Sequence, residues 1–259
     1  MIALLLAAAL PTFHSGGDDV ASTKLSAPGM RMRMNQASAT RSPWADSNGA
    51  RYLRGLKSRA LVATGDNRAD LAAFEAYVFG ADAAIAGSAK DKPAFDKALA
   101  FLQTLPKERQ PALADITFFD DGSVEALENM NLLLRRNLQF RVVKQDERGA
   151  VKPKAGNPSE FAYEVRKKIG DDKRLLRVYG SEVVIARLEG DAKRRAVHLL
   201  NYSNRAVDGV RVRVAETWKS VRVHASDGAL EAADIVHEGA VTEFSLARVG
   251  KYVLVVLTP

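Results

Sequence analysis

Cysteine is missing from this chain of 259 residues. Its absence excludes disulfide bonds, thiolate metal ligands and a cysteine nucleophile. The sequence also lacks the Gly-x-Ser-x-Gly elbow of serine hydrolases, the His-Glu-x-x-His helix of zinc peptidases and the glycine-rich loops that hold nucleotide phosphates. The histidines show no metal-ligand spacing; they are His14, His198, His224 and His237. We therefore expect neither a metal nor a cofactor, and no residue is identified as catalytic.

Long hydrophobic runs are also scarce. The longest, Ile2 to Leu10, is far shorter than the roughly 20 residues needed to cross a bilayer, so no integral membrane part is expected. With the small and polar residues that follow, it matches the apolar core of a secretory signal, although no Lys or Arg precedes it. We therefore expect residues 1–15 to be a signal-like segment of an exported protein, periplasmic or extracellular. A short buried strand or helix is the alternative, and a start upstream of Met1 would explain the missing basic residues.

The formal net charge is +7, but basic and acidic residues are interspersed. No compact basic block alternates with aromatic residues, so nucleic acid is not an expected partner. A diffuse basic excess favours contact with anionic polymers or surfaces, but an ordinary solvated exterior is the more common explanation.

Residues 60–150 alternate between short apolar runs and segments of helical periodicity. The runs are Ala60–Thr64, Ala83–Ala86, Asp115–Phe119 and Leu138–Val143. Apolar strands separated by helices predict a small parallel α/β domain, Rossmann-like or flavodoxin-like. Residues 16–59 are expected to form an N-terminal arm, in which the alternating Met30–Met34 is either an edge strand or an ordered arm.

A polar linker and a helix at 151–180 precede a change of period to two. The segments with this period are Glu182–Leu188, Ala196–Tyr202, Gly209–Val214, Ser220–Ala225, Ala240–Leu246 and Lys251–Leu257. Short strands at such regular spacing predict an antiparallel β-sandwich over 181–259. The arginines Arg211, Arg213 and Arg222 alternate with valines and are therefore expected on the face opposite the core. The fold class expected from the sequence is thus α/β plus all-β.

Asp120 and Asp121 follow the most apolar of these runs, where α/β proteins place ligand sites. One of these carboxylates could bind a sugar hydroxyl or serve as an acid or base. A local interpretation competes with this, in which both shape the turn while Ser123 caps the next helix.

Trp44, Asp46, Asn48 and Arg51 form a second concentration of groups able to bind a ligand. A tryptophan beside hydrogen-bonding side chains is a common way to hold a sugar ring. The alternative is that Trp44 anchors the N-terminal arm on the core while Asn48 and Gly49 make a turn.

The stretches Val197–Tyr202, Val210–Val214 and Glu243–Val256 resemble the small β-sandwich that ends many secreted bacterial glycoside hydrolases. The part before it, above all Ala114–Val143, resembles the amidotransferase-like domain of β-galactosidases that carry a trimerisation domain. The resemblance implies a carbohydrate ligand, and a homo-oligomer or a partner catalytic chain. Those enzymes hold their catalytic carboxylates on a barrel of ~250 residues, for which this chain has no room.

Three functions remain open from the sequence. The first is an exported, non-catalytic protein that binds carbohydrate or assembles with a partner. The second is a divergent or truncated glycoside hydrolase that uses Asp120 or Asp121. The third is a purely structural oligomerisation module.

Overall fold

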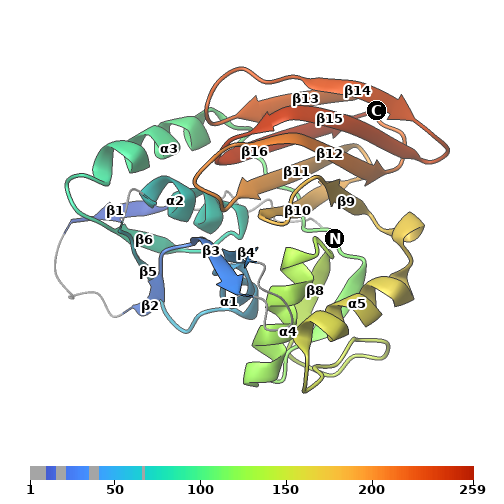
Figure 1. Ribbon diagram of the computed structural model, residues 1–259, viewed down its shortest axis with the longest axis horizontal. Helices are drawn as coiled ribbons and strands as arrows, with labels where there is room; N and C mark the ends of the chain where they lie inside the picture. The colour runs from blue at the N-terminus through green and yellow to red at the C-terminus, as the bar shows by residue number, and fades with distance from the viewer. Residues whose placement is uncertain (1–9, 16–21, 35–40, 66–67) are drawn as a thin grey trace. The chain divides into compact units, whose positions relative to one another are not determined.

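The computed structural model describes residues 10–15, 22–34, 41–65 and 68–259, and contacts divide the chain into two compact units. Unit 1 contains Met1–Arg109 and Tyr202–Arg205, and unit 2 contains Gln110–Asn201 and Ala206–Pro259. Most of the expected signal-like run, residues 2–9, lies outside the described residues. Figure 1 colours the chain along its sequence.

Unit 1 is built on a four-stranded parallel sheet in the order β1-β6-β5-β2. The two inner strands are apolar and almost wholly buried, as parallel strands usually are. The outer two are shorter or more polar; β1 lies within residues 1–15, expected to be a signal-like segment, and β2 lies within the expected N-terminal arm. The strands are β1 (Thr12–His14), β2 (Thr23–Ser26), β5 (Ala60–Ala63) and β6 (Ala83–Ala86).

An antiparallel hairpin and three helices complete unit 1. Helix α2 is buried on nearly every side, because its sequence is almost entirely apolar. Helix α3 buries only one stripe, which includes Phe95, and the Phe95 ring lies 5.3 Å from that of Phe13 in β1. The elements are β3 (Gly29–Met34), β4 (Arg41–Asp46), α1 (Gly49–Arg54), α2 (Ala69–Val78) and α3 (Lys92–Thr104). The alternating methionines thus belong to a strand.

Unit 2 contains two four-stranded antiparallel sheets that share one hydrophobic core. One has the order β10-β11-β16-β13 and the other β14-β15-β12-β9. The shared core takes Val197 from the first sheet and Val212 and Phe244 from the second, each with no exposed surface. The strands are β9 (Leu176–Tyr179), β10 (Val184–Asp191), β11 (Arg194–Asn201), β12 (Val207–Ala215), β13 (Ser220–Ala225), β14 (Ala232–His237), β15 (Val241–Val249) and β16 (Tyr252–Thr258).

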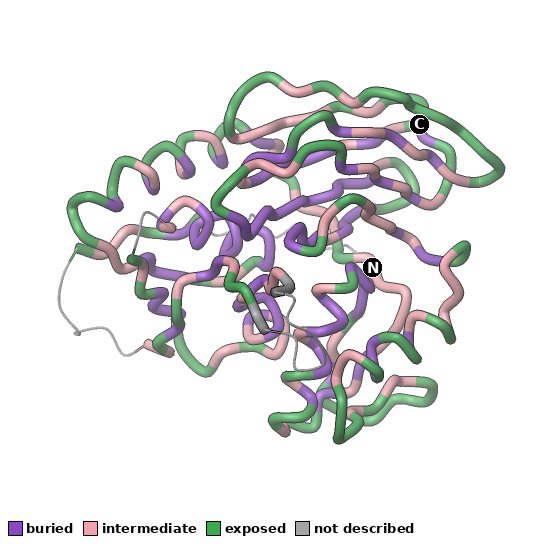
Figure 2. The backbone as a smooth tube through the Cα atoms, viewed as in Figure 1, coloured by how far each residue is buried: buried purple, intermediate pink, exposed green. Residues whose placement is uncertain are grey.

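Burial follows position in these sheets. Strands β11 and β16 carry long buried stretches and β12 buries alternate residues, whereas the edge strand β14 is largely exposed (Figure 2). The valines of β12 point into the core, and Arg211 between them lies on the other face, where it pairs with Glu243. The expected outward placement of Arg211 is therefore confirmed.

Unit 2 also contains a two-stranded parallel sheet with its own helices. Strands β7 and β8 pair from Ile116 with Phe140 to Phe119 with Val143. Val151 forms a bridge on the free side of β7. The elements are β7 (Ile116–Phe119), α4 (Val124–Arg135), β8 (Phe140–Val143), α5 (Pro158–Ile169) and the short 3-10 helix η1 (Asp171–Lys173).

Two amides before β8 join this sheet to the edge of the sandwich. Gln139 Nε2 donates to the carbonyl of Ala186 at 3.1 Å, and Gln139 Oε1 accepts from the amide of Leu188 at 2.9 Å. Asn137 Oδ1 accepts from the amide of Ala186 at 2.7 Å, and Asn137 Nδ2 donates to the carbonyl of Val184 at 3.1 Å. The side chains thus satisfy the open edge of β10 as a neighbouring strand would.

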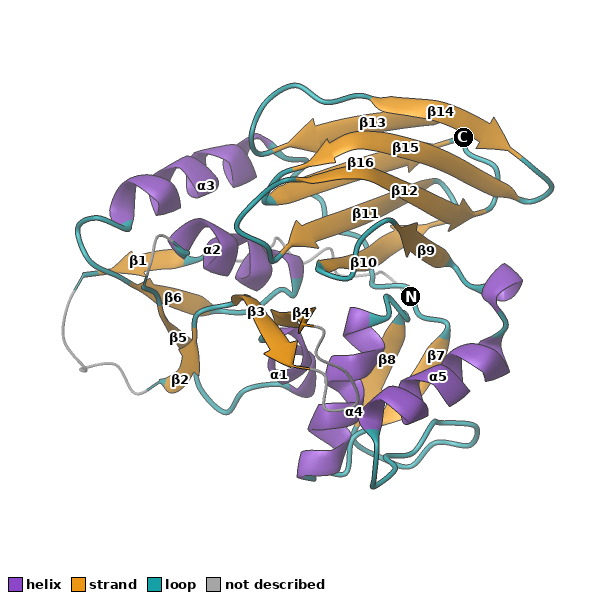
Figure 3. Ribbon diagram, viewed as in Figure 1, coloured by secondary structure: helices purple, strands orange, loops and turns teal. Residues whose placement is uncertain are grey.

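The expected fold class is therefore wrong in its α/β half. The parallel strands of 60–150 do not form one Rossmann-like sheet: β5 and β6 lie in unit 1 and β7 and β8 in unit 2. The described chain is mostly β, with 16 strands in several sheets (Figure 3). The reason is physical, because alternation of strand and helix predicts crossovers but does not determine which strands pair. In the described residues no helix is both long and apolar enough to span a bilayer.

Candidate functional site

The hairpin β3–β4 presents an aromatic ring and a charged pair on one face. In its antiparallel register Arg31 lies opposite Trp44, and Asp46 is two residues further along β4, so the three side chains share a face. Arg31 Nη2 donates to Asp46 Oδ1 at 2.8 Å, and these side chains are 58% and 39% exposed. Trp44 is half-buried with its Nε1 atom covered. The exposed part of the indole is therefore carbon.

Asn48, two residues beyond the hairpin, is turned inward instead. It lies at the N-terminus of α1 with 2% of its surface exposed. Its Nδ2 donates to the carbonyl of Ser26 at 2.9 Å and lies 3.3 Å from Glu75 Oε2. Arg51 lies in α1, and its Nη1 is 3.5 Å from Asn48 Oδ1. The structure thus brings Asn48 and Arg51 together, with the Asn48 amide engaged inside unit 1.

Glu75 in α2 is a buried carboxyl that the sequence reasoning missed. It has no exposed surface. Its Oε1 accepts hydrogen bonds from Ser47 Oγ at 2.7 Å, the backbone N–H of Asn48 at 2.9 Å and Tyr202 Oη at 2.7 Å. Its position was visible as the one acid in the apolar run Ala72–Phe79, since such an acid is buried only when partners surround it.

Burial dominates the protonation chemistry of this cluster. It raises the pKa of Glu75 above its ordinary value, while hydrogen bonds from Tyr202, Ser47 and Asn48 act in the opposite direction. It also raises the pKa of Tyr202, and the charge of Glu75 adds to that shift. The pKa of Tyr52 is raised by the same two causes. The phenols therefore stay protonated, and that of Tyr202 serves as a donor to the carboxylate.

Asp120 follows β7 in unit 2 and is held by a lysine. Its side chain has 0% exposed surface, and Oδ2 lies 2.6 Å from Lys144 Nζ, which follows β8. Its Oδ1 accepts from the amide of Gly122 at 3.0 Å. The pair connects the carboxyl ends of the two parallel strands and neutralises a buried charge.

Asp121 is exposed and shapes the turn into α4. Its Oδ1 accepts from the amide of Ser123 at 2.9 Å. Hydrogen bonds from Ser123, the side chain first and then the backbone, lower the pKa of Asp121. A general acid needs the opposite shift. Ser123 caps the helix, because its Oγ accepts from the amide of Ala126 at 3.0 Å.

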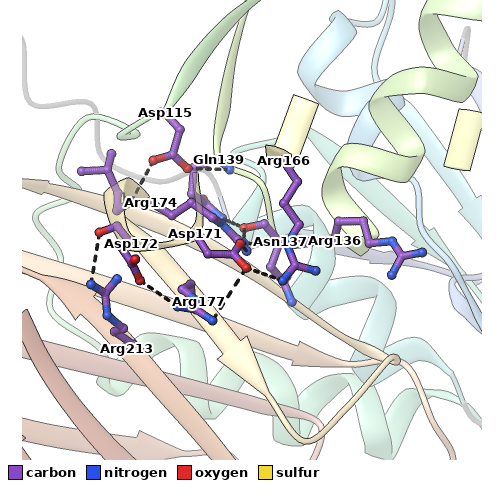
Figure 4. A network of polar contacts seen from close by, with 11 residues as sticks. Asp115, Arg136, Asn137, Gln139, Arg166, Asp171, Asp172, Arg174, Arg177 and Arg213 are labelled. Carbon is purple, nitrogen blue, oxygen red and sulfur yellow. Dashed lines mark hydrogen bonds and ion pairs between the residues drawn. The ribbon is translucent and has the colours of Figure 1, made fainter. Parts of the chain in front are cut away.

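An arginine-rich network surrounds the junction of α5, η1 and β9 (Figure 4). Arg166 forms a bidentate pair with Asp171, with Nε at 2.8 Å from Oδ1 and Nη2 at 2.5 Å from Oδ2. This pair lowers the pKa of Asp171 to about 2. Arg174 is 4% exposed and donates to the carbonyls of Arg136 at 3.1 Å and Asn137 at 2.8 Å. The network joins α4, α5 and the first strand of the sandwich.

Within the part of the chain that the structure describes, no three His, Asp or Glu side chains lie close enough together to hold a metal ion. The most enclosed histidine, His198, is 3% exposed and lies on β11. Its Nδ1 is 2.8 Å from Tyr252 Oη, and its Nε2 is 3.5 Å from Glu189 Oε2. These contacts connect neighbouring strands of one sheet.

The six residues singled out in the sequence thus fall into two groups. Trp44, Asp46, Asn48 and Arg51 belong to unit 1, and Asp120 and Asp121 belong to unit 2.

Solved structures of glycoside hydrolases resemble this chain at very low sequence identity. The α-L-fucosidase isoenzyme 2 from Paenibacillus thiaminolyticus has a TM-score of 0.60 and 10% identity, over 81% of this chain and 62% of the fucosidase. Gan42B, a GH42 β-galactosidase from G. stearothermophilus, has a TM-score of 0.39 and 8% identity, over 89% of this chain and 53% of that one. No family model and no curated protein matches the sequence. The likeness to the fucosidase is one of fold, and the chain spans less than two thirds of that enzyme.

Proposed function

We propose that this chain is an exported, non-catalytic accessory protein, or part of one, that binds carbohydrate through the exposed face of its β3–β4 hairpin. The observation that carries the proposal is the arrangement of Trp44 beside the Arg31–Asp46 pair. An indole offers an apolar surface to the C–H face of a sugar ring, while the charged groups at its edge exchange hydrogen bonds with hydroxyls. The fucosidase-like fold supports the same ligand class.

The proposal that the protein is non-catalytic rests on the structural roles of the Asp120 and Asp121 carboxylates. Asp120 is fully covered and paired with Lys144, and Asp121 is a turn residue with a lowered pKa. Glycoside hydrolysis needs one carboxyl that keeps its proton until the leaving group departs. The surroundings of Asp120 and Asp121 favour a role in holding β7, β8 and α4 together.

Retention on carbohydrate tests the binding. The protein should be retarded in affinity gels containing xylan, arabinogalactan or fucose-containing polysaccharide, and Trp44→Ala should weaken the best interaction by about tenfold or more. Met32→Ala is the matched control, because Met32 lies on the opposite face of the same hairpin and is 55% exposed. Equal loss in both variants, or no retention of the unaltered protein on any gel, would contradict the proposal.

Hydrolysis is tested separately on aryl glycosides, including fucosides and galactosides. We expect no turnover above the uncatalysed rate. Turnover that disappears in Asp121→Asn, an exposed substitution that leaves the buried pair intact, would make the chain a divergent glycoside hydrolase.

A further inference from the structure

A hollow of about 470 Å³ opens on unit 2 beside the arginine network. It lies among the start of β7, the last turns of α5, the segment before Val151 and the entry to β9. Its volume is within the range of about 300–1,000 Å³ that is usual for small-molecule sites. The proposed hairpin site belongs to unit 1, so the two sites share no residue.

Apolar side chains form much of the wall. Ile116, Val151, Ile169 and Leu175 line it, and each is half-buried. Half-buried branched side chains around one concave surface leave part of their apolar area in water, where a ligand can cover it. A ligand that fits must therefore offer an apolar surface of its own.

Asp115 contributes a partly covered acceptor to this wall. Its Oδ1 accepts from the amide of Leu175 at 2.8 Å, and its Oδ2 receives only a long contact of 3.4 Å from the amide of Gln139. Each carboxylate oxygen has two acceptor sites, so both oxygens can still accept a hydrogen bond. Burial raises the pKa of Asp115, although the amide contacts and Arg174 act against it. A hydroxyl on the ligand would satisfy the group.

Lys168 and Lys173 supply two cations at the rim. Among the described residues neither has an ion pair, whereas the acids nearest in sequence, Asp171 and Asp172, are paired with arginines. The local acids are thus engaged by guanidinium groups, and the two ammonium groups remain available to an anion.

From these three features we infer that the hollow binds a sugar acid, a monosaccharide ring that carries a carboxylate. The ring's C–H face covers the apolar wall, a hydroxyl donates to Asp115, and the carboxylate lies between Lys168 and Lys173. An inorganic anion without a proton, such as sulfate or chloride, could not donate a hydrogen bond to the Asp115 carboxylate. A divalent cation would meet two lysines. A neutral sugar would leave both lysines unpaired.

Titration of the isotope-labelled full-length protein with sodium D-glucuronate and D-galacturonate, followed by NMR, tests this inference. We expect amide shifts at Asp115, Lys168 and Lys173 with millimolar affinity for at least one uronate, and binding of D-glucose or sodium acetate weaker by about tenfold or more. Lack of saturable shifts with either uronate would overturn it, as would equal affinity for acetate.

Lys168→Gln/Lys173→Gln should weaken uronate binding about tenfold or more, because both substitutions remove charge from exposed positions where folding is not at risk. Lys167→Gln is the matched control, since Lys167 is an exposed neighbour on α5 that does not line the hollow. An equal loss of uronate affinity in Lys167→Gln would show that the effect comes from net charge alone, and it would contradict the proposed site. Trp44→Ala should leave uronate binding here unchanged, which separates this inference from the hairpin proposal.

Discussion

At the scale of the residue, Glu75 combines full burial with three donors on a single carboxylate oxygen. Ser47, Asn48 and Tyr202 all donate to Oε1, whereas Oε2 has a single longer contact of 3.3 Å from Asn48. The asymmetry matters because a neutral amide can reproduce Oε1 but not Oε2. Substitutions at Glu75 can therefore separate the contribution of its charge to stability from that of its hydrogen bonds.

Glu75→Ala should lower the free energy of unfolding by about 3 kcal/mol or more, because it removes the acceptor shared by Ser47, Asn48 and Tyr202 and leaves a cavity in the core. Glu75→Gln keeps an oxygen for those donors and should cost less than half as much. Urea denaturation followed by circular dichroism measures both values. Equal losses in the two variants would show that the acceptor at Oε1 is not what matters.

The raised pKa of Glu75 also sets the sign of a pH effect. Between the unfolded value, about 4.5, and the higher folded value, the folded state holds a proton that the unfolded state has released. The contribution of Glu75 to stability is therefore greatest below pH 4.5 and declines as pH rises through the folded pKa. Glu75→Gln should remove this decline, which urea midpoints across the acid range would reveal. An unchanged profile in the variant would contradict the assignment.

At the scale of the element, the amides of Asn137 and Gln139 act as a substitute strand for the edge of β10. Gln139→Ala should lower the free energy of unfolding by about 2–3 kcal/mol, because the backbone amide of Leu188 and the carbonyl of Ala186 would lose their hydrogen-bond partner. Gln103→Ala, an exposed glutamine on α3, should change stability by less than about 0.5 kcal/mol. Thermal unfolding of the two variants makes the comparison, and similar midpoints would refute the bridging role.

The junction between α5 and η1 has a pH response of the opposite sign. The pKa of Asp171 is lowered to about 2 by Arg166, so the pair stabilises the folded state above pH 3.8 and loses its effect as pH falls toward 2. Because Asp171 is one-third exposed, Asp171→Asn should cost only about 0.5–1 kcal/mol at pH 7, and almost nothing near pH 2. A constant difference across that range, measured by urea unfolding, would contradict this.

Elements also show where sequence reasoning succeeds and where it stops. Strand-like segments between turn signals identified β10, β11 and β12, although only β12 alternates between buried and less buried residues, because β10 and β11 are buried along nearly their whole length. These signals missed β14, whose residues are nearly all exposed and carry no alternation. The sequence does not predict which strands pair with one another. The short, polar strand β2 gives little strand signal, yet it pairs with β5 at the edge of the parallel sheet. The sequence pattern places Gln139 near the start of the run Leu138–Val143, and its contacts with β10 depend on residues far along the chain.

The candidate site was predictable to the same degree. Local motifs such as the turn of Asp121 and the cap at Ser123 follow from neighbouring residues, and the structure contains them. The Lys144 partner of Asp120 comes from the next strand, and the Tyr202 partner of Glu75 from a distant loop. The spacing of residues in the sequence does not predict such long-range contacts.

At the scale of the whole molecule, unit 1 includes a short segment, Tyr202–Arg205, that lies in the sequence between the two parts of unit 2. A chain ending at Arg109 contains every strand and helix of unit 1 but lacks Tyr202–Arg205. It should therefore show no cooperative thermal transition, because Glu75 loses a donor and its neighbours lose cover. Circular dichroism on heating tests this, and a sharp transition like that of the full chain would contradict it.

The same segment constrains the order in which the protein can be made. A ribosome releases Glu75 long before Tyr202, and most of the residues between them, Gln110–Asn201, belong to the other unit. Unit 1 therefore cannot reach its final hydrogen bonding until β11 has been synthesised. Domains usually finish folding one after another from the N-terminus. Here the buried acid of unit 1 stays incompletely hydrogen-bonded until Tyr202, a residue of the same unit that follows most of unit 1 in the sequence, has been synthesised.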